Sequence, residues 1–157
     1  DPKNYDAQAQ LMWGSTIAHN ETVGVGRVGD FASHQLEHEL SALYDVAHGA
    51  GLAVVFPAWM RFQLKRHTMR LAQFANRVYN VPVNFENPEE TALRGIEAHL
   101  SFLREIGMPT TFAELGAREE DIPLLASKVK RNPGTDTIGR AWPITGAEAE
   151  EVYRLML

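Results

Sequence analysis

Three of the six histidines stand close together in the sequence, at His34, His38 and His48. His34 and His38 are four residues apart, so on a helix their imidazoles lie on one face, about one turn from each other. His48 follows His34 at a distance that, on one unbroken helix, corresponds to a rise of roughly 21 Å. A metal ion binds imidazole nitrogens at about 2.0–2.1 Å, so the chain must bend between His34 and His48 if both hold one ion.

The residues between these histidines are suited to such a bend. Asp45 is a favourable N-cap residue, and Gly49 and Gly51 can leave helical geometry. We therefore expect a first helix to end near Tyr44 and a second to begin near His48. An antiparallel or crossed pair of helices would bring His48 back towards His34.

The competing interpretation is that these histidines line the surface or core of an amphipathic helix. An H-x-x-x-H pair alone favours that interpretation, because it arises readily by chance and no glutamate follows the first histidine as in H-E-x-x-H. The third histidine, on a glycine-bearing turn, favours a metal site. Glu37, Glu39 and Asp45 are further possible carboxylate ligands, although a solvated face or a supporting role behind the ligands is favoured for all three.

The remaining histidines stand apart from this cluster. His67 lies in a basic run and His99 on a helix with a capped start, so we expect both to be solvated rather than to bind a metal. A catalytic divalent ion usually has three protein ligands and one open position, and the chain offers no other ligand at good spacing.

The segment 30–57 reads DFASHQLEHELSALYDVAHGAGLAVVFP and resembles the iron-containing (group III) alcohol dehydrogenases, especially their butanol-dehydrogenase-like branch. The similarity is weaker but collinear towards the end of the chain, where the run EEDIP at 119–123 also matches. The resemblance implies that His34 and His48 bind the catalytic divalent metal, which is iron or else zinc or another ion. It implies that His38 lies beside the substrate and is the catalytic residue.

Members of that family also carry an aspartate and a histidine in a D-xxx-H motif, and a nucleotide-binding α/β domain, upstream of the matching segment. Neither lies upstream of residue 30 in this chain. We therefore expect residues 1–157 to form the helical metal-binding C-terminal domain, with the nucleotide-binding domain absent and the cofactor-binding residues unknown. The resemblance implies that the parent enzyme interconverts primary alcohols and aldehydes by hydride transfer to or from NAD(P). We expect the isolated chain to be inactive.

The composition agrees with one globular domain. The chain has 157 residues, of which 45% are hydrophobic and 22% charged, enough to bury a sizeable core. Its formal charge of −5 argues against nucleic-acid binding. It has no cysteine and no apolar run near the ~20 residues that span a bilayer, so we expect a cytoplasmic protein without a membrane partner. The expected partners are a small alcohol or aldehyde and further copies of the chain in a homo-oligomer.

Apolar spacing predicts an all-α fold of about seven or eight helices without a strand ladder. A buried helix at 49–66 should kink or end at Pro57, and Asn87-Pro88-Glu89-Glu90 should begin another helix with a capping box. The string GVGRVG at 24–29 matches G-x-G-x-x-G, but a helix rather than a strand should precede it, so we interpret it as a loop. Further helices are expected at 5–19, 65–79, 111–115 and 121–130, and from Thr145, with Glu148 at its third position.

A helical interaction or scaffold domain is the alternative function. It would be favoured if His34 and His48 lay more than about 8 Å apart and pointed to different surfaces, since one ion could not then bind both. We also expect exposed apolar residues near the histidines, and self-association of the isolated chain through them.

Overall fold

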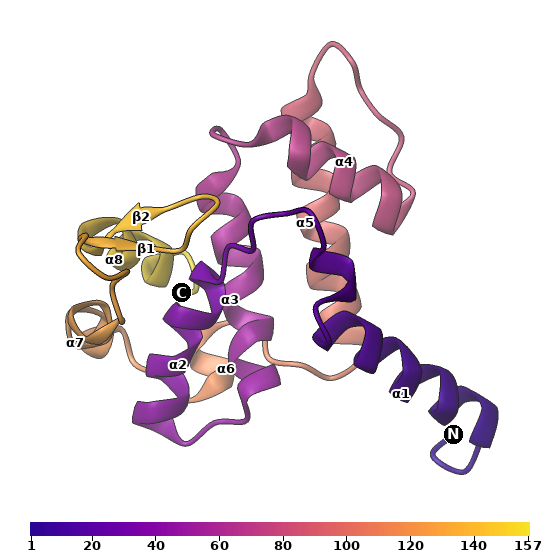
Figure 1. The fold of residues 1–157 in the computed structure, drawn as a ribbon, viewed down its shortest axis with the longest axis horizontal. Helices are drawn as coiled ribbons and strands as arrows, with labels where there is room; N and C mark the ends of the chain where they lie inside the picture. The colour runs from indigo at the N-terminus through magenta and orange to yellow at the C-terminus, as the bar shows by residue number, and fades with distance from the viewer.

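A computed structural model describes residues 1–157 and contains eight α-helices, whose arrangement is drawn in Figure 1. Their bounds are α1 Tyr5–His19, α2 Ala32–Tyr44, α3 His48–Gln63, α4 Thr68–Tyr79, α5 Pro88–Glu105, α6 Phe112–Leu115, α7 Ile122–Lys128 and α8 Gly146–Arg154. Short 3₁₀ turns, η1 Thr22–Gly24 and η2 Glu119–Asp121, follow α1 and precede α7. The all-α prediction is confirmed. No helix has both the length and the apolar character that crossing a membrane requires.

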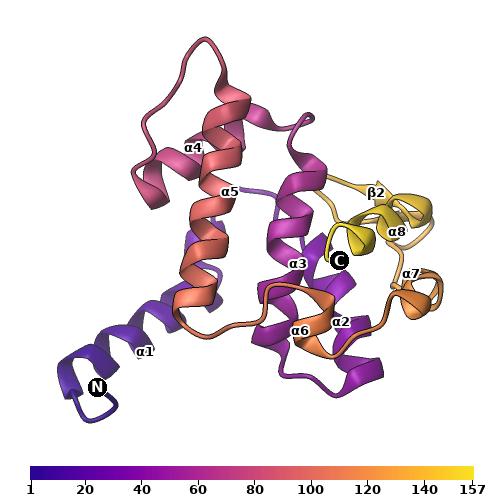
Figure 2. The same cartoon turned by 180° about the vertical axis from the view of Figure 1, so that it is seen from behind.

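Helix α3 takes part in both hydrophobic cores of the molecule. Its middle turns contribute Val54, Val55 and Ala58 to a core of 19 buried residues shared with α2, α6, α7 and α8. Its last turn contributes Met60 to a core of seven buried residues, which α4 and α5 complete. Figure 2 shows α3 in the middle of the molecule, with α5 on one side and α8 on the other. The near-continuous apolar sequence of α3 follows from this position, because few of its faces meet solvent.

The bend between α2 and α3 lies where the sequence predicts it, but different residues make it. Asp45 is not an N-cap: it follows α2 in the left-handed conformation, with φ 52°, and its amide donates to the Ser41 carbonyl. Ala47 precedes α3 without a side-chain cap. Gly49 and Gly51 lie inside α3 rather than in the bend. The helix continues through Pro57, so it does not end there; the alternative of a kink at Pro57 stays a prediction.

The other helix starts largely follow the capping residues. The Thr145 hydroxyl and the Glu148 carboxylate form the full capping box of α8. The Asn87 side chain accepts from the Glu90 amide at the start of α5. The Glu90 carboxylate, however, accepts from the Asn84 side chain instead of closing a capping box. The second half of that prediction is therefore wrong.

One short pair of strands departs from the expectation of a purely helical chain. Strands β1 Thr137–Ile138 and β2 Ile144–Thr145 form one short antiparallel pair, in register at Ile138 and Ile144. Such a pair is too short to show an alternating pattern.

Helix α1 has no buried residue and extends away from the other helices, as both views show. The GVGRVG segment is a loop after this helix, with no strand before it.

Candidate metal site

Helices α2 and α3 bring the three predicted site histidines together. His34 and His38 lie on α2 with ring centroids 6.5 Å apart. The His48 ring, at the start of α3, has its centroid 5.4 Å from that of His34 and 5.6 Å from that of His38. Two imidazoles that share one ion at 2.0–2.1 Å have centroids roughly 5–6 Å apart. The spacing of His34 and His48 therefore fits a shared divalent ion.

The three imidazoles differ in how far the surrounding residues bury them. Burial lowers the pKa of His34, and the neighbouring His48 and His38 lower it further. The neutral form, which binds metals, is thereby favoured. Phe31 stacks on the His34 ring at 4.6 Å between centroids. The His38 and His48 side chains are both exposed, and the His48 side chain keeps 48% of its surface accessible.

Glu37 lies directly behind His48, which the sequence did not reveal. Its side chain is fully buried, and Oε2 contacts Nδ1 of His48. Its other oxygen, Oε1, accepts from the Ser41 hydroxyl. The expectation of a solvated face is therefore wrong for Glu37, and the supporting role is favoured. The only sequence signals were its place beside His38 and a serine four residues later.

One atom each from Glu37, His38 and His48 lie within 4.8 Å of one another. That trio differs from the expected ligand pair, His34 and His48. We interpret the Glu37–His48 approach as a hydrogen bond, because the carboxylate contacts Nδ1 of His48, its other oxygen accepts from Ser41, and the side chain is fully buried. Glu39 and Asp45 do not join the cluster: Glu39 is half-buried, with a pKa raised by burial, and Asp45 is exposed.

A cavity of about 460 Å³ opens beside His34. Aromatic side chains form much of its wall, and Asp30, Arg27 and Arg70 add charges at its edge; the aromatic residues are Phe31, Phe56, Trp59 and Trp142. An apolar wall with a few polar groups next to candidate ligands is typical of a small-molecule site. Trp142 lies more than ninety residues after the histidines in the sequence, so no local pattern connects it with them.

Asp30 positions the loop that carries Trp142. Its Oδ1 accepts from the backbone amides of Arg140, Ala141 and Trp142 at 2.9–3.1 Å. Its Oδ2 is buried without a hydrogen-bond partner. Gly139, at φ 77°, allows the close approach, since an added Cβ would lie 2.8 Å from Oδ1. This loop thus completes the cavity wall from the far end of the chain.

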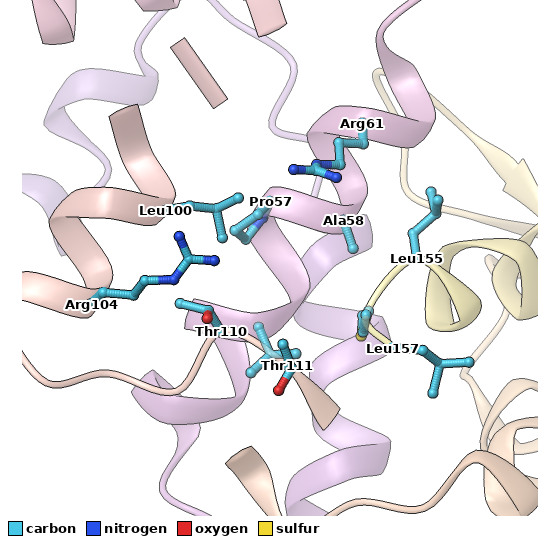
Figure 3. A pocket seen from close by; sticks show the side chains of 11 residues that line it. Pro57, Ala58, Arg61, Leu100, Arg104, Thr110, Thr111, Leu155 and Leu157 are labelled. Carbon is cyan, nitrogen blue, oxygen red and sulfur yellow. The ribbon is translucent and has the colours of Figure 1, made fainter. Parts of the chain in front are cut away.

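Another cavity, of about 180 Å³, lies on a different part of α3 (Figure 3). The Arg61 and Arg104 side chains reach it from α3 and α5, and Thr110, Thr111 and the last three residues complete it. Arg61 is paired with Glu97. No histidine or carboxylate side chain lines this cavity, so it offers no metal ligands.

Two histidines outside the cluster are less solvated than expected. The His67 ring stacks on Trp142, with centroids 4.0 Å apart. His99 is half-buried, and its Nδ1 lies 2.7 Å from the Tyr79 hydroxyl. Both remain partly exposed and neither joins the metal cluster, so the prediction that they are not ligands agrees with the structure, whereas full solvation does not. Each has an aromatic partner on another segment, which local sequence does not show.

Comparison with known proteins gives one consistent result. Residues 1–154 match the model of the Fe-containing alcohol dehydrogenase family, C-terminal part. The chain is 36% identical over 132 residues to a probable NADH-dependent butanol dehydrogenase of Bacillus subtilis, covering 84% of this chain and 34% of that protein. It is 32% identical over 153 residues to the NADPH-dependent aldehyde reductase YqhD of Escherichia coli, covering 98% of this chain and 39% of that protein.

Solved structures agree. The NADH-dependent butanol dehydrogenase A of Thermotoga maritima superposes with a TM-score of 0.90 at 37% identity, over 99% of this chain and 40% of that one. The chain thus spans between about a third and two fifths of the length of these relatives. The match over nearly the whole chain, the shared helical fold and the paired histidines lead to one conclusion: this chain belongs to the iron-containing alcohol dehydrogenase family and corresponds to its C-terminal domain.

Proposed function

We propose that the protein carrying this chain is a metal- and NAD(P)-dependent oxidoreductase that interconverts primary alcohols and aldehydes. The observation that carries the proposal is the convergence of His34 and His48 from two helices, with ring centroids 5.4 Å apart, beside a partly aromatic cavity. The relatives named as NADH-dependent butanol dehydrogenases and an NADPH-dependent aldehyde reductase support the same chemistry. The scaffold alternative required a separation above about 8 Å between these histidines, which the structure does not have.

The proposed role of each histidine follows from the position of its imidazole. His34 and His48 would hold the divalent ion, and a bound ion would supply Lewis-acid polarisation of the alcohol oxygen. Imidazole ligands accept iron, zinc, cobalt and nickel, and iron is the choice that the family name favours. His38 is exposed and one turn along α2 from His34, so it would contact the substrate or relay its proton. The aromatic wall formed by Phe31, Phe56 and Trp142 would exclude water from the substrate's carbon chain.

The substitutions His34→Ala and His48→Ala in the whole protein test this proposal. Each should lower the metal content measured by mass spectrometry, and should abolish alcohol-dependent reduction of the nicotinamide cofactor. His38→Asn should keep the metal but lower kcat by 10²–10⁴-fold, the usual contribution of a proton-transfer group. His99→Gln on α5 is the matched control and should keep both properties. Full metal content in either alanine variant would contradict the assignment.

The 157-residue chain alone should not turn over an alcohol. Direct hydride transfer requires the nicotinamide carbon and the substrate within bonding reach, and such proximity accounts for about 7–11 kcal/mol of a barrier. The nucleotide-binding segment expected for this family is not among residues 1–157. Alcohol-dependent NAD(P)H formation by this chain alone would show that the site is assigned wrongly.

A further inference from the structure

Glu37 is a buried carboxylate that the proposed reaction does not use directly. Its side chain is 0% exposed. On α2 it stands between His34, which is partly exposed, and His38, which is exposed. A buried carboxylate is costly unless hydrogen bonds or a charge partner compensate for the lost water. Both oxygens have such partners, because Oε2 meets His48 Nδ1 and Oε1 meets the Ser41 hydroxyl. Ser41 Oγ in turn lies 3.2 Å from the Val46 carbonyl oxygen, which ties the carboxylate to the bend between α2 and α3.

Space for this carboxylate is made by Gly51. Gly51 is buried in α3, one turn after His48. A Cβ built there would lie 2.7 Å from Glu37 Cγ and 2.9 Å from Cδ, closer than real Cβ atoms come. Any side chain at position 51 would therefore displace the carboxylate from His48. The glycine and the glutamate, fourteen residues apart on different helices, form one arrangement.

The contact between Glu37 and Nδ1 of His48 determines which ring nitrogen is free to bind a metal. When a carboxylate accepts from Nδ1, the ring hydrogen resides on Nδ1 and the lone pair on Nε2. His48 keeps 48% of its side-chain surface accessible, and its ring centroid lies 5.4 Å from that of His34 and 5.6 Å from that of His38. Histidines that bind metals usually donate their other N–H to a carboxylate or carbonyl, which orients the ring and strengthens the ligand.

We propose that Glu37 is the positioning residue of this site: it holds His48 in the Nδ1–H tautomer with Nε2 directed at the metal. This rests on the proposed function, which makes His48 a metal ligand. Glu37 itself is not a ligand, because both of its oxygens are engaged behind the ring and its side chain reaches no solvent. Ser41 and Gly51 support it, the first by a hydrogen bond and the second by leaving room.

The test compares Glu37→Ala, Glu37→Gln and a matched control, Glu39→Gln, in the whole protein. Glu39 has the same side chain two residues along α2 and does not contact the imidazole cluster. Zn²⁺ affinity is measured by competition with a chromogenic chelator. Glu37→Ala should weaken Zn²⁺ binding by 10–100-fold, the usual effect of losing such a partner. Glu37→Gln keeps an oxygen that accepts from Nδ1–H, so its loss should be smaller, and Glu39→Gln should bind as the wild type does.

A second readout does not depend on the metal. Ring ¹⁵N chemical shifts of His48 in metal-free protein distinguish the two tautomers. The wild type should show the Nδ1–H form, and Glu37→Ala should shift the ring towards the Nε2–H form. Unchanged tautomer and unchanged Zn²⁺ affinity in Glu37→Ala would overturn the proposal, and so would loss of Zn²⁺ with an unchanged tautomer, which would make Glu37 a ligand.

These readouts also separate this proposal from the proposed function. A wild type that fails to bind Zn²⁺ would contradict the metal site, whereas the ¹⁵N shifts would still decide whether Glu37 sets the ring. Helical circular dichroism identifies a variant that does not fold. Glu37→Gln is nearly isosteric, so it keeps the test valid if the alanine variant unfolds.

Discussion

Gly49 and Gly51 both lie in the first turn of α3, yet their surroundings differ. Nothing lies within 4 Å of a Cβ added at Gly49, whereas one at Gly51 overlaps the Glu37 side chain. Gly49→Ala should raise the free energy of unfolding by up to about 1 kcal/mol, because alanine favours the helix. Gly51→Ala should lower it by roughly 1–3 kcal/mol despite the same helical preference, because the buried carboxylate must move. Urea denaturation of the pair measures both, and equal stability of the two variants would contradict the close approach.

His99 predicts a pH dependence of stability. Burial lowers its pKa in the folded chain, while the unfolded chain keeps a value near the ordinary ~6.5. As the pH falls below about 6.5, the unfolded state takes up a proton that the folded state resists, so stability decreases. His99→Gln removes this contribution and should lose less stability between pH 8 and pH 5.5 than the wild type. His34 and His67, whose pKa values are also lowered, should keep part of the slope. An unchanged slope in His99→Gln would contradict the role of burial.

At the residue scale, the sequence predicted which histidines meet, but it did not distinguish Glu37 from Glu39 and Asp45 as the carboxylate that supports them. His34 and His48 could be paired because a bend between them was visible in the local sequence. The burial of Glu37 depends on Gly51 of another helix, and no spacing rule connects the two. Asp45 was assigned to the wrong helix end, because an N-cap side chain and a left-handed residue after a helix favour the same residue types.

At the scale of elements, Asp30 joins the start of α2 to the loop before β2. Asp30→Ala removes the acceptor for three backbone amides, and should lower the free energy of unfolding by about 1–3 kcal/mol. Hydrogen exchange at Ala141 and Trp142 should accelerate, since these amides lose their partner, whereas the Arg140 amide keeps the backbone carbonyl of Asp30 as an acceptor. Asp136→Ala is the control, because Asp136 pairs with Arg131 but its side chain is 82% exposed, and such pairs contribute little. Unchanged exchange at Ala141 and Trp142 would rule out this role of Asp30.

Helix boundaries were predictable where a short local signal decides them. Asn87 with Pro88, and Thr145 with Glu148, begin α5 and α8 as expected, because caps act within one turn. Contacts between elements were not predictable in this way. Gly95 of α5, for example, packs so closely on Ala75 of α4 that an added Cβ would lie 2.7 Å from the Ala75 backbone. Nothing near either residue in the sequence indicates that approach.

At the scale of the whole molecule, exposed apolar side chains lead from α1 to the histidine cluster. Leu11, Met12 and Trp13 on α1 are 64–71% exposed. Val25 and Val28 in the following loop are 80% and 69% exposed, and Phe31, which stacks on His34, is 60% exposed. The expectation of open apolar surface near the histidines is therefore confirmed. Contiguous apolar surface of more than a few hundred Å² usually marks an interaction site.

Self-association of the 157-residue chain through this surface remains a prediction. For the wild-type 157-residue chain, the weight-average mass measured by light scattering should rise above the 17.5 kDa of one copy as the protein concentration increases. Replacing Leu11 and Trp13 together by serine should return the mass towards one copy, because burial of these two side chains would supply much of the association energy. Both positions are exposed, so the remaining helices should keep their fold. Phe85→Ser is the control, since Phe85 is 88% exposed in the loop between α4 and α5, and this variant should associate as the wild type does. A single-copy mass for the wild-type chain at every concentration would contradict the prediction, and equal effects of the two variants would place the contact elsewhere.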